Sequence, residues 1–388
     1  MEQLDLLNQV EAPCASLPGA FTSRPPDLFD VQRIVLARGS LDTPEREAFV
    51  RRACSAYPHV PVEEQLNVAH NRVDVGRSSP GDRHAAGKHT LVFGVLNKAV
   101  RFSEESGNCC PNYWHYSVYG FCPYGCTYCY LAGTQGVWFS PTVKVYVNLP
   151  EIMDEMDRIA RGREGATTFY HGKLQDGLAL DLLTAYSTVL VPFFAKHPSA
   201  RQILLTKSAS VERLLPLGHN GATTLSWSLN PPDVVDQFER NVPPVNARIA
   251  AMKRCAASGY PVRAVLMPLI PVPNWDELYT AFVSELVAQV PLERLTIGGV
   301  CTAKQATRLM ETKLGKSNAI TENVKGEDKA GDFRTRYSPQ LCLGMYDAVI
   351  AAARQVRPNL EVGLCLEDTT VWEAVHRRWN LGRCNCIA

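Results

Sequence analysis

The strongest constraint on the fold is an alternation of strand-like and helix-like segments that begins near residue 115. Six apolar runs with strand character are each followed by a helix-like segment. The six pairs are 116–121 with 149–159, 167–170 with 178–194, 202–206 with 211–217, 224–229 with 245–257, 262–269 with 275–290, and 292–297 with 302–314. Such alternation requires crossover connections and therefore a parallel sheet. Because six units cannot close an eight-stranded barrel, we expect an α/β chain built on a partial (β/α)6 TIM barrel.

The sequence on either side of these units suggests four parts. Residues 1–30 predict a flexible N-terminal arm, and residues 31–110 predict a small N-terminal α/β subdomain. The partial barrel is expected over 111–316, and a C-terminal segment over 317–388, with a long helix near 338–354 and a cysteine-rich tail. In parallel α/β folds the chemistry lies at the carboxyl ends of the strands, so functional residues are expected there.

The charge balance argues against a protein that binds polyanions by bulk electrostatics. The 388 residues contain 40 Lys plus Arg and 39 Asp plus Glu, which gives a net charge of +1. A strongly basic surface for nucleic acid or membrane is therefore not indicated, although a local basic groove is compatible with this balance. The apolar runs are too short or too interrupted to span a membrane, and the first residues lack a secretory signal pattern. We expect a cytoplasmic protein with no membrane partner.

Cysteine is the residue type that points most directly to chemistry. The chain contains 13 cysteines. In a reducing compartment structural disulfides are rare, so metal binding or catalysis is the leading explanation for any cluster. Eight of them fall into three groups, namely Cys109 with Cys110, then Cys122, Cys126 and Cys129, and finally Cys365, Cys384 and Cys386.

The middle group has the spacing C-x3-C-x2-C and directly follows the first strand of the series. A [4Fe–4S] cluster is normally held by four thiolates, so the three thiolates of Cys122, Cys126 and Cys129 would leave one iron open to a substrate or cofactor. The alternative is a three-cysteine zinc site. Zinc loops usually pair C-x2-C with a second distant pair, and no such partner is obvious here.

This loop resembles that of the radical S-adenosylmethionine (SAM) superfamily, which has the same spacing and an aromatic residue before the third cysteine, here Tyr128. The closer likeness is to the spore photoproduct lyase branch and covers roughly residues 30–360. The stretches that carry it are 90–95, 126–131, 145–149, 204–207, 226–230 and 257–261. The resemblance implies that the partial barrel is of the radical SAM type.

The resemblance also implies the cofactors. The amino and carboxylate groups of SAM would chelate the open iron, and one electron from the reduced cluster would split a carbon–sulfur bond, usually giving methionine and a 5′-deoxyadenosyl radical. A one-electron donor of the flavodoxin or ferredoxin type is then required. The residues carried over are Cys122, Cys126 and Cys129 for the cluster, Tyr128 near adenine, Tyr130 beside the SAM site, and Lys207, Ser228 and Asn230 as SAM contacts. An ammonium and short hydrogen-bonding groups at strand ends suit a carboxylate or ribose.

The chain departs from the pattern of this branch after the second strand. Spore photoproduct lyase keeps a hydrogen-donating cysteine there, whereas the matching stretch 169–176 contains none and places Lys173 at or beside that position. A lysine N–H is a far poorer hydrogen-atom donor than a thiol. We therefore expect diverged chemistry, with His171, Lys173 and Asp176 lining the substrate side and Tyr130 assisting catalysis. The alternative for this stretch is a strand-end turn with surface polar groups.

The C-terminal cysteines lie beyond the main resemblance. Cys365, Cys384 and Cys386 are compatible with a second Fe–S cluster, a soft metal or metalloid, or a redox pair. Cys109 and Cys110 are poor mutual disulfide partners, and they could join the tail cysteines instead.

Three functions remain to be weighed. The favoured expectation is a radical SAM enzyme, a lyase or a SAM-derived group transferase, that acts on a small molecule or soft element, such as 3-amino-3-carboxypropyl transfer to arsenite. The alternative is a lyase-like enzyme that repairs a DNA lesion, against which the net charge of +1 and the absent donor cysteine count. A structural zinc or Fe–S module that binds a partner is the third and is disfavoured, because such a module needs no lysine at the end of the third strand.

Overall fold

Two sheets organise the chain, and the computed structural model describes residues 17–18, 29–104, 107–325 and 334–388. The predicted N-terminal arm, 1–30, falls mostly outside these described residues. The smaller sheet has the order β2-β1-β3-β8-β6. Its strands are β1 (Arg33–Ala37), β2 (Val62–Gln65), β3 (Thr90–Gly94), β6 (Tyr119–Gly120) and β8 (Val143–Tyr146). All neighbours are parallel except β6, which runs antiparallel to β8.

The larger sheet carries the strand–helix alternation seen in the sequence. Its order is β18-β14-β13-β11-β10-β9-β5-β4. These strands are β4 (Val100–Ser103), β5 (Tyr113–Tyr116), β9 (Thr167–His171), β10 (Ala200–Thr206), β11 (Thr223–Ser228), β13 (Val262–Leu266), β14 (Arg294–Ile297) and β18 (Glu361–Leu364). Every pair from β5 to β18 is parallel, and β4 is antiparallel to β5. The predicted α/β class is confirmed, with mixed sheets that do not close into a barrel within the described residues.

Two small antiparallel pieces contain the remaining strands of the described residues. One pairs β7 (Gly125–Cys126) with β12 (Glu239–Arg240). The other contains β15 (Cys301–Ala303), β16 (Val324–Lys325) and β17 (Arg334–Tyr337). The first of these pieces matters for function, because it attaches the cysteine loop to a segment more than a hundred residues away.

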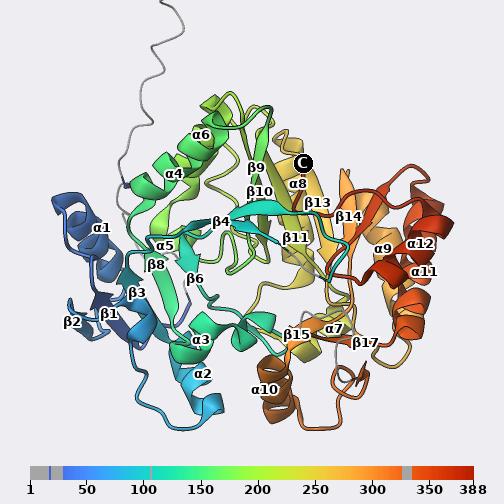
Figure 1. Ribbon diagram of the computed structural model, residues 1–388, viewed down its shortest axis with the longest axis horizontal. Coiled ribbons are helices and arrows are strands. Elements are labelled where there is room, and N and C mark those ends of the chain that lie inside the picture. The colour runs from blue at the N-terminus through green and yellow to red at the C-terminus, as the bar shows by residue number, and fades with distance from the viewer. Residues whose placement is uncertain (1–16, 19–28, 105–106, 326–333) are drawn as a thin grey trace, which may run out of the picture.

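The helices cover the sheets and, in several places, begin with a cap that the sequence supplies. They are α1 (Pro44–Ser55), α2 (Pro80–Lys88), α3 (Gln135–Phe139), α4 (Leu149–Arg161), α5 (Asp181–Thr184), α6 (Ser187–Lys196), α7 (Pro232–Phe238), α8 (Val245–Ala257), α9 (Trp275–Gln289), α10 (Lys304–Leu314), α11 (Pro339–Val356) and α12 (Thr369–Trp379), with 3₁₀ turns η1 (His70–Arg72) and η2 (Tyr130–Gly133). Thr43, Ser79, Ser338 and Asp368 cap α1, α2, α11 and α12 by accepting a backbone N–H. Helices α1 and α2 lie toward one end of the molecule and α11 and α12 toward the other (Figure 1).

Three expected elements differ from the sequence-based prediction. The expected helix over 178–194 is divided into α5 and α6, and Ala185 between them has a φ of 52°. The expected first strand, 116–121, is divided between β5 and β6, which belong to different sheets, and Phe121 has a φ of 63° that ends the extended conformation. The expected helix over 211–217 consists of turns. That segment is short and contains Pro216, which has no N–H to donate to a helix.

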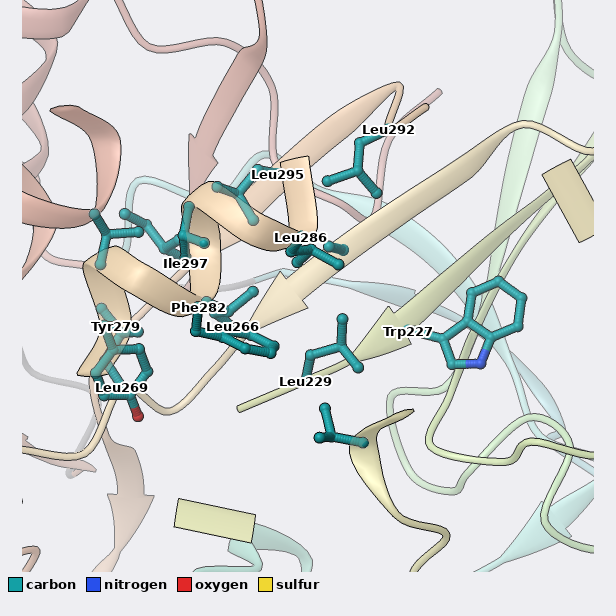
Figure 2. Close-up of a cluster of buried hydrophobic side chains, with 14 of the residues drawn as sticks. Trp227, Leu229, Leu266, Leu269, Tyr279, Phe282, Leu286, Leu292, Leu295 and Ile297 are labelled. Carbon is teal, nitrogen blue, oxygen red and sulfur yellow. The ribbon is translucent and has the colours of Figure 1, made fainter. Parts of the chain in front are cut away.

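The main core fills the space between the larger sheet and the helices at its far end. Figure 2 shows the side chains of Leu266 and Ile297 on strands beside Phe282 and Leu286 of α9, with Trp227 of β11 farther away in the same buried cluster. Burial of apolar surface of this kind contributes about 25 cal/mol per Å². Within the described residues, no helix combines the length and apolar character needed to cross a membrane.

Candidate active site

A cavity of about 250 Å³ lies at the carboxyl ends of the parallel strands. Each of the strands β9, β10, β11, β13, β14 and β18 contributes a lining residue at or just after its last position, and these are Gly172, Lys207, Ser228, Met267, Gly299 and Leu366. The cysteine loop and the C-terminal tail provide other parts of the wall. This is the location expected for chemistry in a parallel α/β fold.

The loop cysteines Cys122, Cys126 and Cys129 all line this cavity. Strand β7 holds the middle one, because Cys126 pairs with Glu239 of β12. The backbone N–H of the next residue, Thr127, donates to the Phe238 carbonyl at 2.8 Å. The loop is therefore attached by main-chain hydrogen bonds to the segment that follows α7.

Lys88, the last residue of α2, fixes the start of the same loop. Its buried ammonium donates to the carbonyls of Cys122 and, at 2.6 Å, of Tyr124. It also lies 3.7 Å from the centroid of the Phe121 ring, a cation–π arrangement. The N-terminal unit thus supports the cysteine loop.

The chemistry of the loop thiols fits a metal cluster. Burial raises the pKa of Cys122 above the usual range and raises that of Cys126 to about 12. Metal ligation requires thiolates, and a nearby metal charge reverses the effect of burial. Three cysteine sulfurs that share one cavity form a suitable donor set for a [4Fe–4S] cluster with one open iron.

Lys207 and Ser228 meet on another side of the cavity, as the sequence suggested. The Lys207 ammonium donates to the Ser228 hydroxyl and lies 3.4 Å from Glu239 Oε1. The fully buried Arg248 guanidinium lies 2.7 Å from Glu239 Oε2. Tyr128 also donates its hydroxyl to this carboxylate. Three groups therefore converge on one buried glutamate.

This glutamate is ionised and orients Lys207. Burial alone would raise the pKa of Glu239, but Lys207 and Arg248 lower it below its usual range. An ammonium has three N–H donors. Two are engaged by Ser228 and Glu239, so one can serve an anionic group inside the cavity that Lys207 lines.

Asp176 ties the β9 loop to the end of β10. Its carboxylate accepts from the Thr206 hydroxyl at 2.6 Å and from the Lys207 backbone N–H at 2.7 Å. Burial raises its pKa despite these bonds. Asp176 also lines the cavity, so the same side chain is part of the cavity wall and holds the end of β10 in place.

Tyr130 and Lys173 contact each other in the cavity wall. Tyr130 is 40% exposed and donates its hydroxyl to the backbone carbonyl of Lys173. The Lys173 ammonium donates to Ser103 and lies 5.1 Å from the Tyr113 ring centroid. Both residues line the cavity, and the contact between them links the cysteine loop to the β9 loop.

His171 and Asn230 lie away from the cavity wall. His171 is 1% exposed, its Nδ1 lies 3.2 Å from the Tyr116 hydroxyl, and burial lowers its pKa to about 3, so its ring is neutral at pH 7. Asn230 is fully buried and accepts from the Tyr279 hydroxyl at 2.8 Å. Neither is among the residues that line the cavity. Strand β11 ends at Ser228, so the shared-face relation of alternate strand residues does not extend to Asn230.

The C-terminal tail crosses the inner face of the larger sheet and brings its thiols into the same cavity. Two fully buried arginines hold it. Arg263 donates to the carbonyls of Asn385 and Ile387 at 3.1 and 2.8 Å, and Arg294 donates to those of Cys384 and Ile387 at 2.9 and 2.8 Å. In Figure 1 the C-terminus accordingly lies near β13.

The tail cysteines meet a cysteine from the other end of the sheet. Cys110, Cys365, Cys384 and Cys386 all line the cavity. Hydrogen bonds from the Cys110, Cys365 and Cys386 thiols lower the pKa of Cys384 well below its usual range. The structure thus gathers the predicted tail group and adds Cys110, whose role the sequence left open.

Sequence reasoning missed Lys88, Glu239 and Arg248. Each reaches the site from a segment with no chemical motif, through contacts between residues far apart in the chain. No pattern in a single sequence marks them. A buried charged residue becomes informative once its partner is known.

Comparisons with known proteins agree with one another. The family model described as spore photoproduct lyase matches residues 33–337. Spore photoproduct lyase of Bacillus subtilis (strain 168) is 30% identical over 240 residues, which cover 61% of this chain and 68% of that protein. The Geobacillus sp. (strain Y412MC61) enzyme is 28% identical over 282 residues, covering 70% and 80%.

Solved structures show the same fold. Spore photoproduct lyase complexed with dinucleoside spore photoproduct superposes with a TM-score of 0.76 at 24% identity, covering 87% of this chain and 99% of that one. A doubly substituted variant with bound AdoMet and dinucleoside spore photoproduct gives a TM-score of 0.75 at 24% identity, covering 86% and 98%.

The expectation of a small-molecule or soft-element substrate, such as arsenite, is wrong. The matched family and the relatives named above are spore photoproduct lyases. One missing cysteine and the net charge were given too much weight. Net charge averages the whole surface, whereas the cavity wall carries Lys173, Lys207 and Arg334 against one carboxylate, Asp176.

Proposed function

Because this chain belongs to the spore photoproduct lyase family, we propose that it repairs spore photoproduct in DNA. It is a radical SAM enzyme of the lyase type, and its cofactors are a [4Fe–4S] cluster and SAM. The observation that carries the proposal is one cavity at the carboxyl ends of the strands that unites the cysteine triad with Lys207 and Ser228. The family match extends on both sides of these residues.

Cys122, Cys126 and Cys129 would hold the cluster, with Lys88 and β12 keeping the loop in place. The cluster and SAM supply, when bound, an organic radical that can abstract a hydrogen atom from a substrate. The protein's part is to hold the reactants and exclude other hydrogen sources. The buried, hydrogen-bonded loop suits this task because it leaves little freedom for the ligands to move.

Lys207 and Ser228 would bind the anionic end of SAM. One carboxylate oxygen of Glu239 pairs with the Lys207 ammonium and holds it in place. The other oxygen pairs with Arg248, which balances the negative charge. Tyr128 presents its ring 5.7 Å from the Lys207 ammonium, in the wall where an adenine could stack. The carboxylate site is therefore pre-organised, which reduces the entropy cost of binding.

The lesion would enter beside Tyr130 and Lys173. Cationic groups on the wall, among them Lys173 and Arg334, suit the phosphate of a dinucleotide. Lys173 stands at or near the position where the family places its hydrogen-donating cysteine. We infer that in this chain the last hydrogen transfer draws on a different source from that cysteine.

Other parts of the proposal concern organisation. The strands of the larger sheet that lie within 111–316 would form a partial (β/α)6 barrel, flanked by the segments 31–110 and 317–388, which contribute β4 and β18 to the same sheet. A one-electron donor of the flavodoxin or ferredoxin type would reduce the cluster, in the reducing cytoplasm where free thiols persist.

The test is a repair assay with a defined substrate. The anaerobically reconstituted protein is incubated with SAM, dithionite and dinucleoside spore photoproduct, and loss of the lesion is followed by chromatography and mass spectrometry. Repair that requires SAM and is absent from a Cys129→Ala variant is expected. Cleavage of SAM without any consumption of the lesion would overturn the proposal.

A further inference from the structure

Four cysteines form a second thiol group in the cavity wall, distinct from the loop triad. Cys110 precedes β5, Cys365 directly follows β18, and Cys384 and Cys386 belong to the C-terminal tail. The sulfur atoms of Cys110, Cys365 and Cys384 all lie within 4.8 Å of one another. Cys386 adds a thiol hydrogen bond to Cys384. Three segments that are distant in sequence thus place their sulfurs at one point.

The spacing of these sulfurs identifies the kind of metal centre they can form. In a tetrahedral zinc site with Zn–S bonds near 2.3 Å, neighbouring sulfurs are about 3.8 Å apart. The sulfurs of Cys110, Cys365 and Cys384, all within 4.8 Å of one another, are compatible with that separation. A four-iron cube spreads its thiolates more widely, because each binds a different iron. Within the described residues, the loop triad does not form such a close group.

We propose that Cys110, Cys365 and Cys384 bind a single zinc ion. Cys386, whose thiol contacts that of Cys384 but does not lie within 4.8 Å of all three other sulfurs, would turn toward the ion as the fourth ligand. Four thiolates make a closed structural site with no open position for a substrate. The ion would join the segment before β5, the end of β18 and the tail. The proposal does not depend on which lesion or molecule the enzyme acts on.

The surroundings of the group resemble the outer shell of a metal site. The backbone N–H of Leu366 donates to the Cys110 sulfur at 3.2 Å, and the N–H of Cys365 donates to the Ile297 carbonyl at 2.9 Å. Outer hydrogen bonds of this kind orient ligands and stabilise thiolates. Arg294 holds the carbonyl of Cys384 itself at 2.9 Å. The ligands are therefore held by main-chain contacts before any ion binds.

The close approach of the tail to β18 also depends on a glycine. A Cβ atom at Gly363 would lie 2.1 Å from the Arg383 carbonyl oxygen. The backbone at Arg383, next to Cys384, can therefore pass directly over the strand that leads into Cys365. This contact sets the distance between two of the ligands.

The experiment is metal analysis of the full-length protein, purified and reconstituted with iron and sulfide under anaerobic conditions. We expect about four irons and about one zinc per chain. Cys384→Ser should lower zinc to below about one fifth of an equivalent while iron stays near four. Cys122→Ala should lower the iron content while zinc stays near one per chain. Cys54→Ser, on α1, should keep both metals.

A second measurement covers the case in which Cys384→Ser does not fold. X-ray absorption at the zinc edge of the unmodified protein should show a sulfur shell near 2.3 Å with about four neighbours. A protein with no zinc, with eight irons, or with a disulfide among these four cysteines would overturn the proposal. Because metal content is read without substrate, failure here leaves the repair assay unaffected, and the reverse also holds.

Discussion

The two thiol groups share a cavity but are built in opposite ways. The loop triad lies within eight residues of chain, from Cys122 to Cys129. Buried charged side chains surround it: Lys88 binds the loop, and Lys207 pairs with Glu239 nearby. The tail group contains Cys110, Cys365 and Cys384, which come from distant parts of the chain. Arg263 and Arg294 hold the tail by donating hydrogen bonds to its backbone carbonyls.

This difference separates a reactive site from a supporting one. Around the triad, Lys88 fixes the cysteine loop, and Lys207, which pairs with Glu239, lines the cavity with a charge that can bind a polar reactant. Around the tail group, hydrogen bonds to main chain fix the path of the peptide. We therefore expect changes at the first group to alter catalysis and changes at the second to alter stability and metal content.

The largest expected effect is at the triad. Cys126→Ala removes one of the three proposed cluster ligands, so cleavage of SAM should fall to background, measured as 5′-deoxyadenosine formed with dithionite under anaerobic conditions. Cys54→Ser is the matched control and should retain cleavage. If Cys126→Ala kept both its iron and its activity, the division of roles between the two groups would be wrong.

Glu239→Gln should have the next largest effect. The substitution leaves Lys207 and the fully buried Arg248 without their carboxylate, and breaking a buried pair typically costs about 3–5 kcal/mol in the free energy of unfolding. Urea denaturation measures this change. Glu212→Gln removes a carboxylate that pairs with Arg254 on the surface, where loss of such a pair costs about 1 kcal/mol or less. Equal effects of the two variants would show that the Glu239 pairing does not stabilise the site.

Gly363→Ala tests the packing that positions the tail group. The added methyl would meet the Arg383 carbonyl at 2.1 Å, so we expect a loss of about 1–3 kcal/mol in stability together with weaker zinc retention. Gly344→Ala is the control, because nothing lies within 4 Å of its Cβ position in α11 and alanine favours a helix by roughly 0.5–1 kcal/mol. An unchanged zinc content in Gly363→Ala would contradict a tail held by close packing.

The sequence alone was sufficient for the features that are local in the chain. The C-x3-C-x2-C spacing predicted the triad, and the strand–helix alternation predicted the α/β class and most helices of the larger sheet. Lys207 and Ser228 were carried over from the family resemblance, and they meet in the structure. The cysteine spacing and the strand–helix alternation are short-range patterns that a single sequence contains.

The remaining features depend on contacts between distant segments. Glu239 lies beside the cysteine loop because β12 pairs with β7. The sequence around Glu239 contains no pattern that predicts this pairing. Asn230 was expected as a SAM contact together with Ser228, but β11 ends at Ser228 and Asn230 does not line the cavity. The position of Cys110 next to Cys365 and Cys384 likewise requires the order of strands in the sheet, which the sequence does not specify.

The smallest expected effect concerns His171, whose catalytic role remains a prediction. Burial lowers its pKa to about 3, so the folded protein keeps the ring neutral where the unfolded chain, with a pKa near 6.5, takes up a proton. Between these values the unfolded state binds more protons, so stability falls as pH falls, by about 1.4 kcal/mol per pH unit. His171→Phe should reduce this slope between about pH 6.5 and 5 in urea denaturation, whereas the exposed His59→Gln should leave it unchanged.

A histidine that acts in catalysis would also change the pH profile of lesion repair. If His171→Phe altered that profile and not the pH dependence of stability, His171 would belong with the reactive residues around the triad, although it does not line the cavity.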